Sequence, residues 1–417
     1  MIRVRTNTKG AYAIKFTVPK TAKAGKHVIT VKAENKKTVL ATLSVTMGAQ
    51  PTTAPTTAPT TAPTTAPTTA PTTAPTTAPT TAPTTAPTTA PTAPPPGNLA
   101  GALYNASSVA SLPMSGPAWA ALKAQADKAI GSPNIVDQDD NTDLNILAAG
   151  LVYARTGDAA YRTKVIAALK AAVETENGGR TLALARNLPG YVLAANLVSL
   201  QTADPTFDTN TFKPWLRSLL TETLDGQTLT STHERRPNNW GTHAGAARVA
   251  VALYLGDQAV LTRSAAVFHG WLGDRTAYAS FEYGDVSWQC DSSKPVGINP
   301  VCAKSGHDIG GALPDDMRRG GSFSWPPAST GYPWEALQGA ILQAELLHRA
   351  GYDAWNWENK ALLRATEFLY EGIGWAAEGD DSWQPFLLDA RYGTSYQGAI
   401  PTNNGKNFGW TDWLYGS

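Results

Sequence analysis

Apolar residues recur every three or four positions through most of the chain after residue 98. This spacing places them on one face of an α-helix. In residues 335–351, Leu337, Ile341, Ala344 and Leu347 share one face at 4-3-3 spacing. Eight further segments have a helical pattern: 117–130, 143–157, 159–176, 182–200, 212–224, 245–256, 258–273 and 358–372. Several end in glycine followed by Asp or Tyr, a C-terminal signal.

Paired helices with short links, and no comparable series of strands, predict a mainly α domain over residues 98–417. The expected architecture is an (α/α) toroid, an incomplete barrel of helical hairpins with a cleft at one end. The alternative is a helical bundle without a ring. The long tryptophan-rich loops between the helices favour the toroid.

The first 97 residues have a different pattern. Residues 1–48 alternate apolar and polar positions in YAIKFTVP, HVITVKAE and VLATLSVT, which predicts the strands of a partial immunoglobulin-like β-sandwich module. Residues 49–97 form a linker that holds ten copies of Pro-Thr-Thr-Ala. Proline at every fourth position prevents helices and sheet ladders, so we expect this linker to be disordered.

The net charge of +1 is unevenly distributed. Residues 1–50 hold ten Lys/Arg and one Asp/Glu (+9), which leaves 24 basic and 32 acidic residues (−8) for the remainder. The helical domain is therefore not a general binder of nucleic acid or other polyanions, and an acidic ligand requires a local site. No apolar run is long enough to span a membrane. No signal peptide precedes the strands, and the linker alone predicts a secreted or cell-surface protein, which we expect to be a monomer.

Cys290 and Cys302 are twelve residues apart in a loop rich in Gly, Pro and Asp. In an exported protein they would form a disulfide, and two free thiols are the alternative. No His/Cys cluster has zinc spacing, and DQDDNTD resembles a calcium loop only loosely. We expect no metal and no cofactor.

The first candidate site lies in HERRPNNWGTH, residues 233–243. If a helix begins near Asn238, Asn239 and His243 are at i and i+4 and point the same way. An amide, an imidazole and free helix N–H groups would then converge on one anion. Alternatively, Asn238 caps the helix and His243 is a buried core residue.

Two further segments hold candidate residues. Residues 306–339 are largely irregular, as functional loops often are, or their charges pair with each other at the surface. They include His307, Asp315, Asp316, Arg318, Arg319 and Tyr332. Residues 174–196 supply Arg180, Arg186, Asn187 and Tyr191, for which a structural role is the favoured alternative. Trp240, Trp325 and Trp334 are candidates for stacking on sugars, with burial in the core as the alternative.

Six ordered blocks resemble the alginate-lyase-like polysaccharide lyases of family 38. They are RRPNNWGTHAGAARVAVALYLGD, YGDVSWQCD…PVGINP, LPDDMRRGG, WEALQGAILQAELLHRAGYDAWNWENKALLRA, GDDSWQPFL and GKNFGWTDW. The resemblance covers most of residues 100–417. It implies an (α/α) toroid, β-elimination and a 1,4-linked uronic-acid polymer as substrate, either glucuronan or an alginate-like polymer.

Such a lyase removes the C5 proton of a uronate, so it must neutralise the neighbouring carboxylate, and it must protonate the leaving O4. The resemblance assigns the acid/base role to Tyr332. The resemblance assigns neutralisation of the carboxylate to Asn239, with Asn238 as the alternative, and to His243. In a second version His243 is a base. Arg318 or Arg319 supplies the cation, and His307 is a second candidate histidine. Compared with family 5 alginate lyases, Tyr332 lies farther from the arginines, and Trp240, Gly241 and Thr242 separate Asn239 from His243.

Stereochemistry leaves two mechanisms open. In glucuronate and mannuronate the C5 proton and O4 lie on the same face, so one tyrosine can take and return the proton. Guluronate needs a base and an acid on opposite faces. The rival functions are a glycoside hydrolase that uses Asp315 or Asp316 with Glu335, and a carbohydrate-binding surface protein without catalysis.

Overall fold

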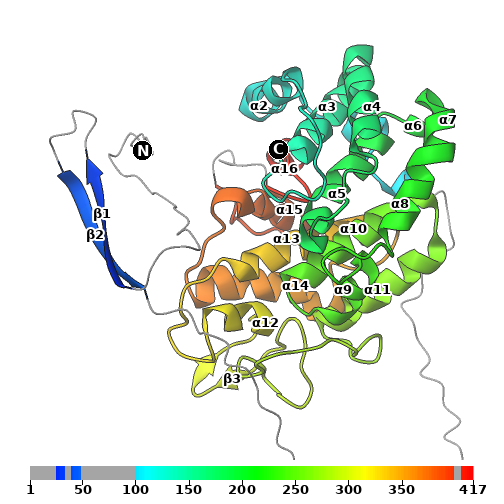
Figure 1. The fold of residues 1–417 in the computed structure, drawn as a ribbon. Helices are drawn as coiled ribbons and strands as arrows, with labels where there is room; N and C mark the ends of the chain where they lie inside the picture. Colours follow the sequence, from blue (N-terminus) through cyan, green and yellow to red (C-terminus); the bar gives the residue numbers. More distant parts are fainter. Residues whose placement is uncertain (1–24, 33–38, 48–98, 399–404, 417) are drawn as a thin grey trace, which may run out of the picture. The chain divides into compact units, whose positions relative to one another are not determined.

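The computed structural model describes residues 25–32, 39–47, 99–398 and 405–416, which belong to two separate bodies (Figure 1). The first body contains strands β1 (Gly25–Lys32) and β2 (Val39–Met47), which pair antiparallel with Val28 opposite Ser44. They match the strands predicted from HVITVKAE and VLATLSVT. The strand predicted from YAIKFTVP, the rest of the immunoglobulin-like module and the linker at 49–97 lie outside the described residues.

The second body is mainly helical, as predicted. Its longer helices are α2 (Gly116–Asp127), α3 (Thr142–Thr156), α4 (Ala159–Ala172), α5 (Thr181–Leu197), α8 (Lys213–Leu219), α9 (Leu229–Arg235), α10 (Asn239–Leu255), α11 (Gln258–Leu272), α13 (Tyr332–Arg349), α14 (Trp357–Glu367) and α15 (Gln384–Tyr392). The shorter elements are η1 (Leu99–Ala102), α1 (Ala106–Val109), α6 (Leu200–Ala203), α7 (Pro205–Phe207), η2 (Asp208–Phe212), β3 (Ala303–Lys304), β4 (His307–Asp308), α12 (Pro314–Met317), η3 (Arg318–Gly320), η4 (Phe368–Gly372), η5 (Gly379–Asp381) and α16 (Thr411–Tyr415).

Each of the nine segments with helical apolar spacing overlaps one of these helices. The four residues predicted to share a face of α13 are fully buried. Gly157 and Gly256 end α3 and α10 in the left-handed conformation (φ 73° and 69°), as the C-terminal signal predicts. Sequence analysis did not find α9 or α15. The seven-residue α9 is set by a capping box between Thr228 and Ser231, and α15 has nine residues, so both are too short for a clear repeat.

The helices close into a ring. α3, α5, α10 and α13 pack on one another in chain order, and α15, α16 and α2 complete the circuit back to α3. α4 and α11 pack against α3 and α10 from outside this series. Where the two ends of the body meet, the Trp413 indole donates to the Pro113 carbonyl at 2.8 Å and its ring lies 5.5 Å from that of Trp119. Figure 1 shows α16, in red, beside the cyan helices.

Two helices of the ring are buried on nearly every side. Arg186 is the only residue of α5 that is not buried, and Trp240 and Leu255 are the only such residues of α10. A helix that is apolar around its whole circumference belongs in the centre of a fold. Polar side chains at the ends of α5 and α10 are therefore held firmly by the packing around them.

Glycines bring α10 and α13 into close contact. A Cβ atom on Gly339 of α13 would lie 2.4 Å from the carbonyl carbon of Thr242, and one on Gly245 would lie 2.2 Å from Oε1 of Gln343. Gln343 uses this proximity to donate from Nε2 to the Thr242 carbonyl at 2.9 Å. The crossing fixes how the first turn of α13 lies over His243.

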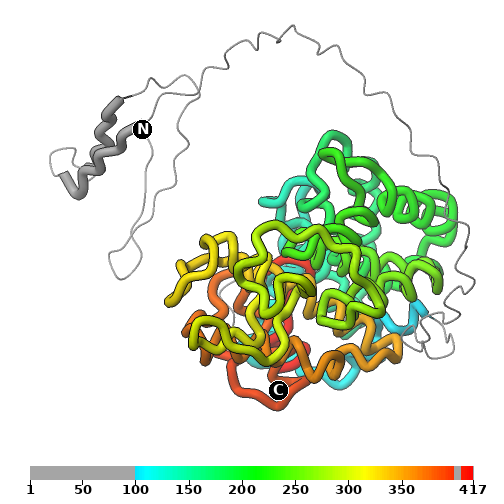
Figure 2. Tube along the Cα trace, turned by 90° about the horizontal axis from the view of Figure 1, so that it is seen from below, coloured from blue at the N-terminus to red at the C-terminus, as the bar shows by residue number. Residues whose placement is uncertain are grey.

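A long, mostly irregular segment, residues 274–331, covers one end of the ring, at the bottom of Figure 1 and facing the viewer in Figure 2. A disulfide joins Cys290 and Cys302 within it. Within the same segment, Trp288 donates from Nε1 to the Gly321 carbonyl at 3.0 Å. In the described part of the chain, no helix is both long and apolar enough to cross a membrane.

The close crossing of α10 and α13 predicts that a methyl group added at Gly339 destabilises the fold. Gly339→Ala should lower the free energy of unfolding by about 1–3 kcal/mol, because the new Cβ overlaps the α10 backbone. Gly331→Ala, at the start of the same helix, is the control, since nothing lies within 4 Å of its Cβ. Urea denaturation measures both variants, and an equal effect of the two would refute the role given to the crossing.

Candidate active site

The start of α10 is docked on α12. Asn238 accepts from the Trp240 N–H at 3.2 Å and donates from Nδ2 to Asp315 Oδ2 at 2.9 Å. The Asn239 N–H donates to Asp316 Oδ1 at 3.0 Å. The first N–H groups of the helix therefore already have partners. The predicted cap is present, whereas the predicted anion site made of free helix N–H groups is wrong.

The two candidate arginines differ in their partners. Arg318 forms a bidentate pair with Asp315, with Nε at 2.6 Å and Nη2 at 3.0 Å from its carboxylate oxygens. Arg319 is exposed, and its guanidinium lies over the Tyr332 ring, 4.0 Å from the ring centroid. Arg318 is thus engaged by the protein, and Arg319 lies beside the predicted acid/base.

His243 is fully buried between two partners. Its Nδ1 contacts Oδ1 of Asn407, whose Nδ2 donates to the Ala185 carbonyl at 3.2 Å. That second bond orients the amide, so Nδ1 carries the imidazole proton and Nε2 faces Glu335 Oε2 at 3.7 Å. Burial lowers the pKa of His243, against the opposing effect of Glu335 and Asn407. A histidine with no exposed surface does not meet a substrate directly, which corrects the role predicted for it.

Glu335 lies between His243 and Arg186. The Nη2 atom of Arg186 is 3.4 Å from Glu335 Oε2 and 3.2 Å from Asp380 Oδ2. In the described part of the chain, the buried Nε of Arg186 has no hydrogen-bond partner. Burial opposes the ionisation of Glu335, but His243 and Arg186 together hold its pKa below the ordinary value. The cluster therefore presents an ionised carboxylate and a shared guanidinium.

Asp381 adds an uncharged acid next to this cluster. Its Oδ1 accepts from Gln338 Nε2 at 2.8 Å and from Gln384 Nε2 at 2.9 Å. Burial, helped by the charges of Asp380 and Glu335, raises its pKa to about 8. Asp381 is therefore mostly protonated at neutral pH, which limits the negative charge of the cluster.

The segment that carries Asn407 is anchored by a buried ion pair. Lys406 Nζ lies 3.0 Å from Asp143 Oδ1 and contacts the Asp140 carbonyl. The Asn407 N–H donates to the Arg186 carbonyl at 3.1 Å. Sequence analysis named neither Asn407 nor Asp380, although both lie in the blocks GKNFGW and GDDSWQ. Glu335 was named only for a hydrolase.

Residues 122–275 match the family model of alginate lyase. This match over part of the helical body supports an alginate-lyase-like polysaccharide lyase, a carbon–oxygen lyase that acts by β-elimination. The matched residues include Arg186, Asn239 and His243 and end before Arg319 and Tyr332. A search of curated proteins found no match.

Three of the predicted substrate-binding residues have structural roles in the lyase instead. Tyr191 is fully buried with its hydroxyl against Thr142 Oγ1, and burial raises its pKa. Asn187, also buried, donates to the carbonyls of Ile135 and Asp137. Trp334 is buried and donates to the Trp375 carbonyl at 3.0 Å. These side chains have no surface to offer a sugar.

His307 and Trp325 stack on each other, with ring centroids 4.6 Å apart. Both are partly exposed on the irregular segment. In the described residues, neither side chain hydrogen-bonds to the cluster around His243, so the proposed second histidine is not part of that cluster.

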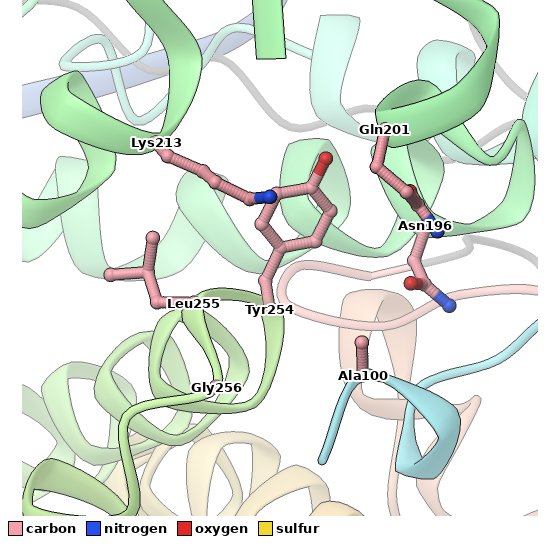
Figure 3. A pocket seen from close by; sticks show the side chains of 7 residues that line it. All are labelled: Ala100, Asn196, Gln201, Lys213, Tyr254, Leu255 and Gly256. Carbon is pink, nitrogen blue, oxygen red and sulfur yellow. The ribbon is translucent and has the colours of Figure 1, made fainter. Parts of the chain in front are cut away.

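One cavity of about 310 Å³ lies away from these residues (Figure 3). Its lining includes Lys213, Tyr254, Asn196 and Gln201 and none of the predicted site residues. The ammonium of Lys213 and the hydroxyl of Tyr254 both bind Asp208, at 2.7 and 2.6 Å. These groups satisfy one another, and the cavity is separate from the cluster around His243.

The raised pKa of Asp381 predicts a pH-dependent stability. Between an unfolded pKa of about 4 and the folded value of about 8, the folded state binds more protons, so rising pH destabilises it. Asp381→Asn should remove this contribution, so that the stability lost between pH 5 and pH 8 is smaller in the variant. Urea midpoints at both pH values measure it.

The control is Asp291→Asn, because Asp291 is exposed and hydrogen bonds from Ser293 lower its pKa, so it stays ionised throughout this range. If wild type and Asp381→Asn lost equal stability from pH 5 to pH 8, Asp381 would not be a neutral acid in the folded lyase.

Proposed function

We propose that the lyase cleaves a 1,4-linked glucuronic acid polymer, glucuronan or a close relative of the family 38 substrates, with Tyr332 as both base and acid. The observation that carries this proposal is the position of the Arg319 guanidinium over the Tyr332 ring at 4.0 Å, where both residues are partly accessible. A cation beside the acid/base can stabilise the charge that develops when a uronate loses its C5 proton.

The reaction balances with these groups. The ionised Tyr332 oxygen takes the C5 proton, the C–H electrons form the C4–C5 double bond, and the C4–O4 bond breaks. The phenol then gives the same proton to O4 and returns to its starting state. Arg319 is assigned to the substrate carboxylate, because Arg318 and Asn238 are engaged by Asp315 and Asn239 is buried.

His243 and Glu335 are assigned to positioning. Glu335 is one turn after Tyr332 on α13, so the buried contact to His243 and the bond to Arg186 hold the turn that carries the tyrosine. A histidine with no exposed surface is poorly placed as the opposite-face base that guluronate requires. Its burial thus supports same-face elimination, and with it glucuronate or mannuronate.

The carboxylates that a hydrolase would use are poorly available. Asp315 is held by Arg318 and Asn238. Asp316 is fully buried, and burial with the charge of Asp315 raises its pKa well above the ordinary value. Neither can flank a glycosidic bond opposite Glu335. The alginate lyase match likewise argues against a protein that only binds carbohydrate.

Trp240 offers a platform for a neighbouring sugar. It is one of two residues of α10 that are not buried, and the guanidinium groups of Arg180 and Arg236 lie over its ring at 5.5 and 5.9 Å from the centroid. An aromatic face with two flanking cations suits a uronate unit.

The proposal also covers the location and the oligomeric state of the protein. The protein acts as a secreted or cell-surface monomer on an anionic polysaccharide. The linker and the Cys290–Cys302 disulfide, both typical of exported proteins, support this location. The N-terminal β module and the linker space the lyase domain from another surface.

Tyr332→Phe should lower kcat/KM on glucuronan by about 10²–10⁴-fold, because the variant can neither take nor return the C5 proton. The ultraviolet absorbance of the C4–C5 double bond measures this on glucuronan, polymannuronate, polyguluronate, hyaluronan and chondroitin. Tyr153→Phe is the matched control, since Arg162 lies over that tyrosine at 5.4 Å on the surface. Full turnover by Tyr332→Phe would remove Tyr332 from the mechanism, and reducing ends without absorbance would indicate a hydrolase.

The Trp240 platform predicts a change in KM. Trp240→Ala should raise KM for long substrates about tenfold and leave kcat nearly unchanged, because an aromatic contact is lost at a distance from the reacting bond. Arg180→Gln combined with Arg236→Gln should raise KM more at low salt than at high salt. Arg162→Gln is the control. A fall in kcat alone would contradict the platform.

A further inference from the structure

We propose that His269, Asp274 and Glu358 form a binding site for one divalent transition-metal ion of the zinc class, separate from the proposed reaction. One ligand atom from each lies within 4.8 Å of the others. His269 is in the last turn of α11, Asp274 follows that helix, and Glu358 is in the first turn of α14. α11 and α14 pack on one another (Figure 1), so an ion here would link two helices.

The imidazole of His269 lies between two carboxylates, and this arrangement calls for a positive charge at the site. Its Nε2 lies 3.1 Å from Glu358 Oε1 and its Nδ1 lies 3.6 Å from Asp274 Oδ2. A neutral imidazole has one N–H, so one of its nitrogens presents a lone pair to a carboxylate. The Nδ1 atom is buried and has no hydrogen-bond partner among the residues that the structure describes. The lone pair and the carboxylate repel each other, and either a proton or a metal ion on the nitrogen removes this repulsion. A divalent ion also neutralises the negative charge of the two carboxylates.

Outer contacts orient the ligands as they do in metal sites. Oδ1 of Asp274 accepts from the Thr276 N–H at 2.8 Å and from its hydroxyl at 2.6 Å, which turns Oδ2 toward His269. The indole of Trp357 stacks on the imidazole at 4.6 Å and fixes the plane of the ring. Such partners set the direction of the ligand lone pairs.

The backbone around Glu358 has an unfavourable conformation. Glu358, Asn359 and Lys360 have φ of 53°, 54° and 59°, a left-handed turn that L-residues rarely form. Arg364 stabilises it by donating to the carbonyls of Glu358 and Asn359. Gly273 lies opposite, where a Cβ would come within 3.2 Å of Glu358 Oε2. This left-handed turn places the Glu358 carboxylate beside His269.

One imidazole and two carboxylates favour zinc, cobalt or manganese over calcium, which prefers oxygen ligands alone. A fourth position is left for water. His269 lies on α11, Asp274 just after it and Glu358 on α14, whereas the proposed catalytic residues lie on α10, η3 and α13, so the ion is expected to stabilise the fold.

The test uses untagged protein stripped with a chelator. Wild type should bind one Zn²⁺ per chain by calorimetry, and Co²⁺ should produce visible d–d absorption bands. Excess Zn²⁺ should raise the thermal unfolding midpoint by several degrees. His269→Gln should abolish all three effects, and Glu358→Gln, in case His269→Gln does not fold, should weaken binding at least tenfold. Thr276→Val should weaken binding by about 10–100-fold through the orientation of Asp274.

His348→Gln, at the end of α13, is the matched control and should bind like wild type. Zinc binding that His269→Gln leaves unchanged would overturn the proposal. So would a wild-type protein that binds no Zn²⁺ by calorimetry and whose unfolding midpoint is insensitive to Zn²⁺ and Co²⁺.

Discussion

The close crossing of α10 and α13 is the constraint on which the rest of the site depends. Because Gly339 has no side chain, α13 lies against the backbone of Thr242 and His243. This brings Glu335 within 3.7 Å of the buried imidazole, with Tyr332 one turn earlier on the same helix. A larger residue at the crossing would separate the two helices, and with them the proposed acid/base, Tyr332, from the contacts of Glu335.

Charge pairing then decides which groups remain for a substrate. Asp315 engages Arg318 and Asn238, and Asp143 engages Lys406. Arg186 is shared by Glu335 and Asp380, which leaves Arg319 beside Tyr332. Outside its first 50 residues the chain has a net charge of −8. An anionic polymer is therefore drawn to a few uncommitted cations and not to the surface as a whole.

Sequence patterns predicted much of the fold, because apolar spacing reports directly on helix faces. The cap at Asn238 and the shared direction of Asn239 and His243 followed from spacing along one helix. The burial of His243, Tyr191 and Trp334 did not, since it depends on what other helices place around them. Contacts between residues far apart in the sequence, such as His243 and Asn407, which are 164 residues apart, cannot be predicted from spacing along one helix. The His269 triad also joins residues 89 positions apart, and the sequence therefore indicated no metal.

The most direct test of the account is a crystal structure of the Tyr332→Phe variant with a glucuronate tetrasaccharide bound. The account predicts one uronate carboxylate on the Arg319 guanidinium, with C5 and O4 of the neighbouring bond turned toward the ring at position 332, within about 3.5 Å of the position the hydroxyl would occupy. A sugar whose carboxylate sits on the Glu335–Arg186 pair, with C5 facing away from position 332, would contradict it.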